Sequence, residues 1–192
     1  IYLVATNPLD TMTYVTLKLS KFQPNKVLGS GTTLDTARLK FLIGKELDIN
    51  AKDVHAYVLG EHGDSEFVAW DNATIAGNPC NKLLSDDQMG KISYDVRTSA
   101  YDIINKKGNT AYGIGMCLLK ITNAILNNER SILTISCYNS EHDIYFSKPA
   151  LIGKNGIERE IFIKLSEKDA SKLLTSIETL QDTKNLIIDK LK

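Results

Sequence analysis

The feature that most constrains the fold is a run of short strand-like segments late in the chain. Residues 131–138, 144–152 and 161–165 each show this pattern, and Asn155-Gly156 predicts a tight turn between the last two. Helical patterns precede and follow these segments. Because helices are interspersed with hairpin-like strands, we predict an α+β fold with a mostly antiparallel sheet, rather than a doubly wound parallel sheet.

The remaining segments complete this prediction. Residues 1–6 are apolar and end at Asn-Pro, which predicts a short buried strand. Gly108 after two lysines predicts the end of a long helix. Ser166 with Asp169 resembles a capping box at the start of the last helix. The predicted helices span residues 10–19, 33–47, 85–106, 110–126 and 166–191, and the other predicted strands span residues 26–30 and 54–59.

Composition narrows the possible partners. Lys plus Arg and Asp plus Glu are each 23 of 192 residues, so the formal net charge is zero. This balance gives no support for nucleic acid or an anionic membrane as a partner, and no apolar run is long enough to span a bilayer. Cys80, Cys117 and Cys137 are widely spaced and odd in number. We therefore expect no metal site and no disulfides, but buried thiols in a reducing compartment, the cytoplasm.

The sequence lacks a cradle for a dinucleotide. No Gly-x-Gly-x-x-Gly lies between a strand and a helix, and the nearest candidate, residues 29–31, lacks the third glycine. The chain opens directly on a strand-like run with no initiator Met, and this run is too short for a signal peptide. We therefore expect that an N-terminal part precedes this chain in the whole protein.

Of the three histidines, His62 is the strongest candidate for chemistry. It follows an apolar strand and lies between Gly60 and Gly63, where the backbone is free to turn and a ligand can approach closely. His142 lies in a polar segment, which is typical of a solvated surface histidine. His55 lies in a predicted strand, where a packing role is the simplest interpretation.

A carboxylate beside an imidazole holds its tautomer and stabilises the imidazolium, which makes histidine an acid and base near neutral pH. The candidates for this carboxylate are Asp35, Asp64 and Glu61. On a helix, Asp35 and Arg38 share a face. They could form only a surface ion pair, or Asp35 could serve a histidine while the planar guanidinium of Arg38 binds a substrate carboxylate. Spacing alone leaves both possibilities open.

Several motifs occur together in this chain. Residues 7–10 are Asn-Pro-Leu-Asp, residues 29–38 are Gly-Ser-Gly-Thr-Thr-Leu-Asp-Thr-Ala-Arg, and residues 60–65 are Gly-Glu-His-Gly-Asp-Ser. In order and approximate spacing they resemble the lactate/malate dehydrogenase family. Residues 107–115, Lys-Gly-Asn-Thr-Ala-Tyr-Gly-Ile-Gly, resemble its lactate branch. Residues 149–157, Pro-Ala-Leu-Ile-Gly-Lys-Asn-Gly-Ile, extend the resemblance across nearly the whole chain.

The resemblance implies a role for each matching residue. His62 would exchange a proton with the substrate oxygen, and Asp35 would orient it. Arg38 would bind the substrate carboxylate bidentately and fix its plane. Asn7 would hydrogen-bond the substrate oxygen, and Thr110 would line the pocket. The implied activity is the interconversion of pyruvate and (S)-lactate by hydride transfer to or from NAD, whose chemistry belongs to the cofactor.

The resemblance also implies the domain organisation. Residues 1–192 would be the substrate-binding, catalytic C-terminal domain, with residues 1–19 at the junction with an N-terminal NAD-binding Rossmann domain. Asn7 and Ala5 would contact NAD. The glycine fingerprint, the acidic residue for the ribose and the loop with a second catalytic arginine are missing. We therefore expect the chain on its own to be inactive.

Further implications concern regulation and assembly. In family members activated by fructose 1,6-bisphosphate, a basic residue and a histidine bind its phosphates; here these positions hold Lys40, in place of the usual Arg, and His55. The lactate branch is expected to form homotetramers. The alternatives are a malate or other L-2-hydroxyacid dehydrogenase, since the segment that selects the substrate is missing, or an inactive oligomerisation domain.

Overall fold

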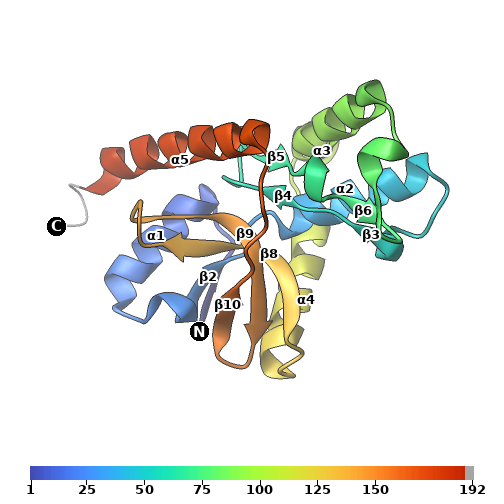
Figure 1. Ribbon diagram of the computed structural model, residues 1–192. Helices are drawn as coiled ribbons and strands as arrows, with labels where there is room; N and C mark the ends of the chain where they lie inside the picture. Colours follow the sequence, from blue (N-terminus) through green and yellow to red (C-terminus); the bar gives the residue numbers. More distant parts are fainter. Residues whose placement is uncertain (189–192) are drawn as a thin grey trace.

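A computed structural model of the protein describes residues 1–188 and centres on a five-stranded sheet (Figure 1). Its order is β1 (Tyr2–Val4), β2 (Val27–Gly29), β8 (Ser131–Asn139), β9 (Ile144–Gly153) and β10 (Gly156–Glu160). Strands β1 and β2 are parallel, and the other neighbours are antiparallel. This arrangement confirms the prediction of an α+β fold with a mostly antiparallel sheet.

The helices cover both faces of this sheet. In Figure 1, α5 runs above β9 and α1, while α4 lies behind β8. The predicted helices are confirmed to within a few residues at their described ends; the predicted end of the last one, residue 191, lies outside the described residues. No helix within residues 1–188 is both long and apolar enough to cross a membrane. The α-helices are α1 (Leu9–Ser20), α2 (Thr33–Glu46), α3 (Asp86–Lys107), α4 (Tyr112–Leu126) and α5 (Glu167–Ile188), and 3-10 turns span Pro24–Lys26, Ala51–Asp53, Trp70–Asn72 and Cys80–Lys82.

The predicted strand at residues 54–59 is split. Residues 54–55 pair in a three-stranded sheet, and residues 58–59 pair in a separate two-stranded sheet. The change of pairing partner falls at Ala56 and Tyr57. The Ala69 N–H donates to the Tyr57 carbonyl at this crossing. The small strands are β3 (Val54–His55), β4 (Val58–Leu59), β5 (Phe67–Val68), β6 (Thr74–Ile75) and β7 (Asn78–Pro79).

Two other predictions need correction: the strand within residues 1–6 is present as β1 but is not buried as predicted, and the strand at residues 161–165 is absent. Strand β1 is not buried: it is an edge strand with a neighbour on one side only, and Tyr2 is 46% exposed. Residues 161–165 form no strand, because the chain leaves the sheet after Ile161, whose N–H donates to the Pro149 carbonyl. Beyond that point Ile163 packs against a small apolar cluster instead of pairing in the ladder.

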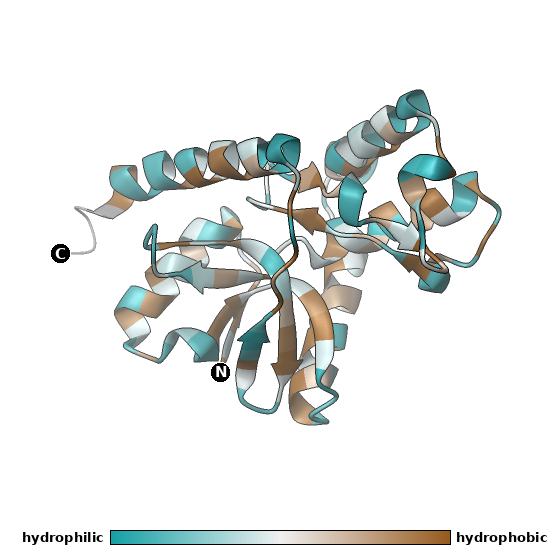
Figure 2. Ribbon diagram, viewed as in Figure 1, coloured by the Kyte–Doolittle hydropathy of each residue, from teal (hydrophilic) through white to brown (hydrophobic). Residues whose placement is uncertain are grey.

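The two faces of β8 differ in chemistry. Leu133, Ile135 and Cys137 face helix α4 in one apolar cluster, as the period of two along a strand requires. Thr134 and Ser136 point to the opposite face and are also buried. Figure 2 shows apolar residues along the central strands, whereas apolar and polar residues alternate along helix α5. The polar face of β8 therefore lies under helices α1 and α2, where the candidate residues gather.

A second apolar cluster joins α2 to α3 and to the small strands. Helix α3 begins at a capping box formed by Ser85 and Gln88, and it ends as predicted at Gly108, which adopts a left-handed conformation at the C-cap. The three cysteines are free and buried, as expected. The apolar cluster that joins α2 to α3 and to the small strands includes Leu39, Ile43, Val54, Val58, Cys80, Ile92 and Val96.

One carboxylate ties the outer helices to the sheet. Asp143 accepts hydrogen bonds from Tyr14 (2.8 Å) and Tyr138 (2.7 Å), and it pairs with Lys18 (3.0 Å) and Lys184 (3.3 Å). These residues come from α1, β8 and α5. Partial burial raises the pKa of Asp143, but the hydrogen bonds and Lys18 outweigh it and hold this pKa well below its usual range.

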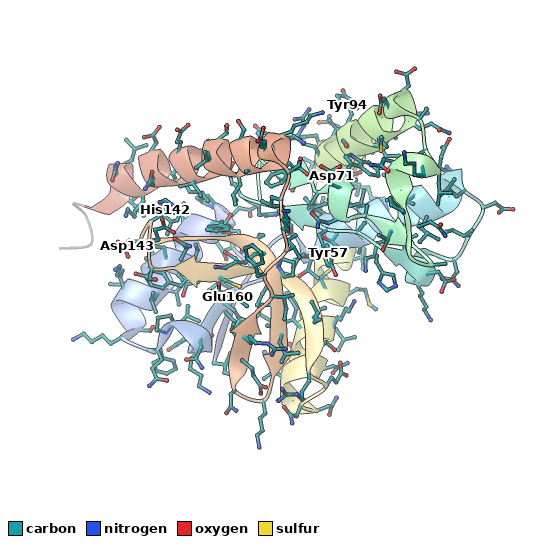
Figure 3. The ribbon with its side chains drawn as sticks, in the orientation of Figure 1. Tyr57, Asp71, Tyr94, His142, Asp143 and Glu160 are labelled. Atoms are coloured by element: carbon teal, nitrogen blue, oxygen red, sulfur yellow. The ribbon has the colours of Figure 1, made fainter. Side chains whose placement is uncertain are left out.

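We expect Asp143→Asn to lower the melting temperature by about 3 °C near pH 7. The asparagine amide has no negative charge to pair with Lys18 and Lys184, and it accepts fewer hydrogen bonds than the carboxylate does. Because the folded pKa is depressed, the stabilisation is present above the unfolded value of 3.8 and is lost as the pH falls through the folded value. Thermal unfolding should therefore show a difference that shrinks below pH 4. The exposed Asp71 offers the control Asp71→Asn, for which we expect no such change (Figure 3).

Candidate active site

Threonines at the start of α2 fasten this helix to two strands. The Thr32 hydroxyl donates to the Val58 carbonyl (2.6 Å), and the Thr36 hydroxyl accepts from the Val58 N–H (3.0 Å). Thr33 donates to the Thr134 carbonyl of β8 (2.7 Å). Since β4 leads directly into the loop that carries His62, these bonds set the first turn of α2 beside that loop.

The structure brings together Asp35, His62 and Arg38. One carboxylate oxygen of Asp35 lies 2.9 Å from Nδ1 of His62, and the other accepts from Nη1 of Arg38 at 3.0 Å. The Asp35 side chain is 4% exposed, whereas that of His62 is 27% exposed. A hydrogen bond from Nδ1 to Asp35 leaves Nε2 free to meet a ligand. Asp35 therefore makes both the ion pair with Arg38 and the hydrogen bond with His62, which spacing in the sequence left as alternatives.

The two competing carboxylates have other partners. Asp64 accepts a hydrogen bond from the Tyr101 hydroxyl (2.9 Å), and Glu61 accepts from both the hydroxyl and the N–H of Ser65. Neither is bonded to the imidazole of His62. Among the three candidates from the sequence, the geometry selects Asp35.

The loop that begins at Gly60 is fixed through its backbone. Gly60 has φ +90°, and a Cβ there would overlap Ser176 of α5, so the glycine is required for both conformation and space. Its N–H and C=O exchange hydrogen bonds with Ser147 of β9 (3.1 and 2.8 Å). The Glu61 N–H donates to the Ser176 hydroxyl (3.3 Å). The loop is thus held from the sheet and from α5 before it reaches His62.

The charges around His62 favour its protonated form. Burial alone would lower the pKa of His62, but the hydrogen bond and charge of Asp35, with smaller effects from Asp10 and Glu66, outweigh it and raise this pKa above its usual value of 6.5. The raised pKa increases the fraction of His62 that carries a proton near neutral pH, and the protonated imidazole can give this proton to an oxygen atom placed at Nε2.

Sequence reasoning missed two carboxyl groups at this site. The Asp10 carboxylate accepts a hydrogen bond from the backbone N–H of His62 at 2.7 Å. Burial, and then the charge of Asp35, raise the pKa of Glu66 above its usual range. Glu66 follows His62 by four residues, but nothing in that spacing shows that it turns back toward Asp35. Asp10 is part of the Asn-Pro-Leu-Asp motif at residues 7–10. An aspartate in the first turn of a helix is, however, equally typical of a solvated surface residue, so the sequence did not single it out.

Within residues 1–188, no side-chain hydrogen bond or ion pair joins the other predicted substrate and cofactor residues to this group. Asn7 and Ala5 are exposed in the segment between β1 and α1. Thr110 is half-buried between α3 and α4. The start of α4 does lie against α2, since a Cβ on Gly113 would come within 3.3 Å of Leu34. Thr110 precedes Gly113 by three residues, and Leu34 is next to Asp35 in the sequence. Thr110 is therefore close along the chain to the point where α4 meets α2.

A cavity of about 520 Å³ lies beside the site rather than on it. Glu66, Arg97 and Tyr94 are among its lining residues, and His62 is not. Asp35, His62 and Glu66 each offer a ligand atom within 4.8 Å of the others, the spacing of a metal site. Both oxygens of Asp35, however, already accept hydrogen bonds, so the group is first of all a hydrogen-bonded acid–base cluster.

The remaining candidates are spread over the molecule. Lys40 lines a pocket of about 340 Å³ together with Lys52 and Lys120, and His55 does not line it. Burial, and then the charge of Lys120, lower the pKa of Lys40. His55 is exposed on β3. Figure 3 shows His142 beside Asp143 at the turn between β8 and β9, where it is partly buried.

Comparison with known proteins gives consistent matches. L-lactate dehydrogenase 2 of a Bacillus cereus strain is 44% identical over 193 residues, which cover 95% of this chain and 62% of the relative. L-lactate dehydrogenase 1 of Listeria monocytogenes serovar 1/2a is 44% identical over 188 residues, covering 94% of this chain and 60% of the relative. The chain thus spans about 62% of the length of these relatives.

Solved structures give the same result. A lactate dehydrogenase from a Medee basin deep-sea metagenome library has a TM-score of 0.92 and 43% identity, over 95% of this chain and 62% of that one. The minor L-lactate dehydrogenase from Enterococcus mundtii, in a ligand-bound form, has a TM-score of 0.91 and 35% identity over the same shares. A family model described as the alpha/beta C-terminal domain of lactate/malate dehydrogenase matches residues 32–191. The chain belongs to the lactate/malate dehydrogenase family.

Proposed function

We propose that this chain is the substrate-binding, catalytic domain of an NAD-dependent L-lactate dehydrogenase that interconverts pyruvate and (S)-lactate. The observation that carries the proposal is the arrangement of Asp35, which bonds Nδ1 of His62 with one oxygen and Arg38 with the other. A proton donor and a guanidinium are thereby held side by side by one buried carboxylate. A 2-oxo acid offers both of their partners, a carbonyl oxygen and a carboxylate.

His62 performs the proton transfer in this proposal. In the direction of reduction, Nε2 gives its proton to the oxygen of the pyruvate carbonyl, and Asp35 stabilises the imidazolium until that moment. In the direction of oxidation, neutral His62 takes the proton of the lactate hydroxyl. Arg38 has donors beyond the one bound to Asp35, and these bind the substrate carboxylate and set the plane of the molecule.

NAD, when bound, supplies or accepts the hydride. The residues of this chain that fit its nicotinamide end are Asn7 and Ala5, which are exposed just before α1 and only three to five residues from Asp10, the partner of the His62 backbone. No glycine-rich phosphate cradle is present in this sequence. We therefore propose that NAD binds mainly to an N-terminal domain outside this chain, and that residues 1–192 alone are inactive.

The names of the relatives support the choice of substrate. Both curated relatives are named L-lactate dehydrogenases, which favours pyruvate over oxaloacetate, with Thr110 lining the pocket. We also propose a cytoplasmic homotetramer. An allosteric site for fructose 1,6-bisphosphate at Lys40 and His55 is supported by the cationic pocket around Lys40, although His55 lies outside it.

In the intact protein we expect rapid reduction of pyruvate by NADH and slow reduction of oxaloacetate. We expect His62→Gln to lower kcat for pyruvate by about 10³-fold with the fold retained, because glutamine cannot donate a proton in this way. Steady-state absorbance of NADH measures both, and circular dichroism checks the fold. The matched control is His142→Gln, at the turn between β8 and β9, where the backbone N–H of His142 donates to Asn139. Near-normal turnover of the His62 variant would contradict the proposal.

The two directions of the reaction should respond oppositely to pH. Pyruvate reduction needs the imidazolium and lactate oxidation the neutral imidazole, so kcat/KM should fall with rising pH for pyruvate and rise for lactate. Because the pKa of His62 is raised, both changes should have their midpoint above pH 6.5. Asp35→Asn removes the principal cause of this shift and should move the midpoint to lower pH. A midpoint that does not respond to Asp35→Asn would count against the assigned pair.

Lys40 allows a test of the allosteric site. If the sugar bisphosphate binds there, adding it to the intact enzyme should lower KM for pyruvate, and Lys40→Met should abolish this response because the positive charge is lost. Lys45, an exposed lysine of the same helix, offers the control Lys45→Met, which should respond like the wild type. Absence of activation in the wild-type enzyme would remove this part of the proposal.

A further inference from the structure

Asp10 occupies an unusual position for a charged residue. It lies in the first turn of α1, close to the partial positive charge of the helix N-terminus, and it is only 2% exposed. A buried carboxylate is costly unless its oxygens accept hydrogen bonds. Both oxygens do: one accepts from the Ser136 hydroxyl and the other from the backbone N–H of His62 at 2.7 Å.

These two contacts join three separate segments. Ser136 is fully buried at the centre of β8, and its position is fixed by close packing: a Cβ added to Gly29 would come within 2.8 Å of the Ser136 Cβ. Asp10 therefore connects a rigid point of the sheet to the backbone of the loop that carries His62. Further backbone contacts of this loop lie before His62, from Gly60 to Ser147 and from Glu61 to Ser176, and after it at Ser65, whose carbonyl accepts from the Ser176 hydroxyl (2.6 Å).

Asp10 also adds charge to the surroundings of His62. The acidic groups that face the imidazole are Asp35 from α2, Asp10 from α1 and Glu66 from the same loop. Burial raises the pKa of Asp10 to about 6, although Ser136 and His62 both lower it and Glu61 raises it further. Because Asp10 is negatively charged above its own pKa, its charge there favours the protonated form of His62.

We propose that Asp10 is a positioning residue of this active site, which holds the backbone of His62 in place and sets a second negative charge against its imidazole. The proposal rests on the function proposed above for the chemistry of His62. Asp35 orients the ring through Nδ1 and Asp10 orients the main chain through the N–H, so the two carboxylates restrain the same residue from two helices. Neither contact uses Nε2, which stays free for the substrate.

The variant Asp10→Asn separates charge from geometry. The asparagine carbonyl can still accept from the His62 N–H, and its amide can donate to the Ser136 hydroxyl, so the connection survives while the charge is lost. We expect the pKa of His62 to fall by about one pH unit. NMR titration of the intact protein, labelled in its histidines, measures this directly, because within this chain only His55, His62 and His142 contribute signals. The pH profile of kcat/KM for pyruvate should move by the same amount.

A matched control comes from α5. Asp169 is also a buried aspartate in the first turn of a helix, 3% exposed, but it pairs with Lys172 (2.7 Å) and does not contact His62. Asp169→Asn should leave the His62 titration unchanged. A general loss of stability would affect both variants, whereas the proposed role affects only Asp10→Asn.

Ser136→Ala provides the second test if Asp10→Asn does not fold. It removes one donor, raises the pKa of Asp10 further and so weakens its charge near neutral pH; we expect the pKa of His62 to fall in the same direction. An unchanged His62 pKa in the folded variant would overturn the proposal. The titration needs no turnover: a protein without lactate dehydrogenase activity but with a shifted His62 pKa would refute the proposed function and leave the role of Asp10 standing.

Discussion

The antiparallel pairing of β8 with β9 is the constraint on which the rest of the structure depends. The two strands pair continuously from Ser131 with Ile152 to Asn139 with Ile144. Their apolar face is covered by α4, while the other face carries the polar residues that bind α1, α2 and the His62 loop. A shift of one residue in this register would exchange the two faces. Core packing and the geometry of the site are therefore fixed by the same ladder.

The site itself consists of short polar connections made in a buried place. Thr32 and Thr36 fasten α2 to β4, which brings Asp35 to His62. Asp10 reaches the same loop from α1. Hydrogen bonds in such surroundings are worth more than at the surface, and an unmatched partner costs more. Against the effect of burial, Asp35, with smaller effects from the other carboxyl groups, raises the pKa of His62, whereas burial, followed by the charge of Asp35, raises the pKa of Glu66.

Much of the fold was predictable because its patterns are local. The helix from Asp86 to Lys107 follows from Ser85 and Gln88 at one end and Gly108 at the other. The errors arose where pairing partners decide the outcome. Residues 54–59 form one apolar run, yet they serve two sheets. Residues 161–165 have strand character, but no strand edge accepts them beyond Ile161. Local periodicity contains no information about which edge is free.

For the site, the sequence by itself supplied the candidate residues and the resemblance to a family. A histidine between glycines, and an Asp and an Arg one helical turn apart, were recognisable from residue types and spacing, and the order of the motifs pointed to the family. The resemblance already implied Asp35 as the partner of His62, whereas residue types and spacing left Asp64 and Glu61 open. The tertiary structure shows the contact with Asp35 and gives Asp64 and Glu61 other partners, and only it revealed Asp10. The physical reason is that hydrogen bonds depend on distances of a few ångströms between segments far apart in the chain. Those distances are set by the register of β8 and β9 and by the threonines at the start of α2.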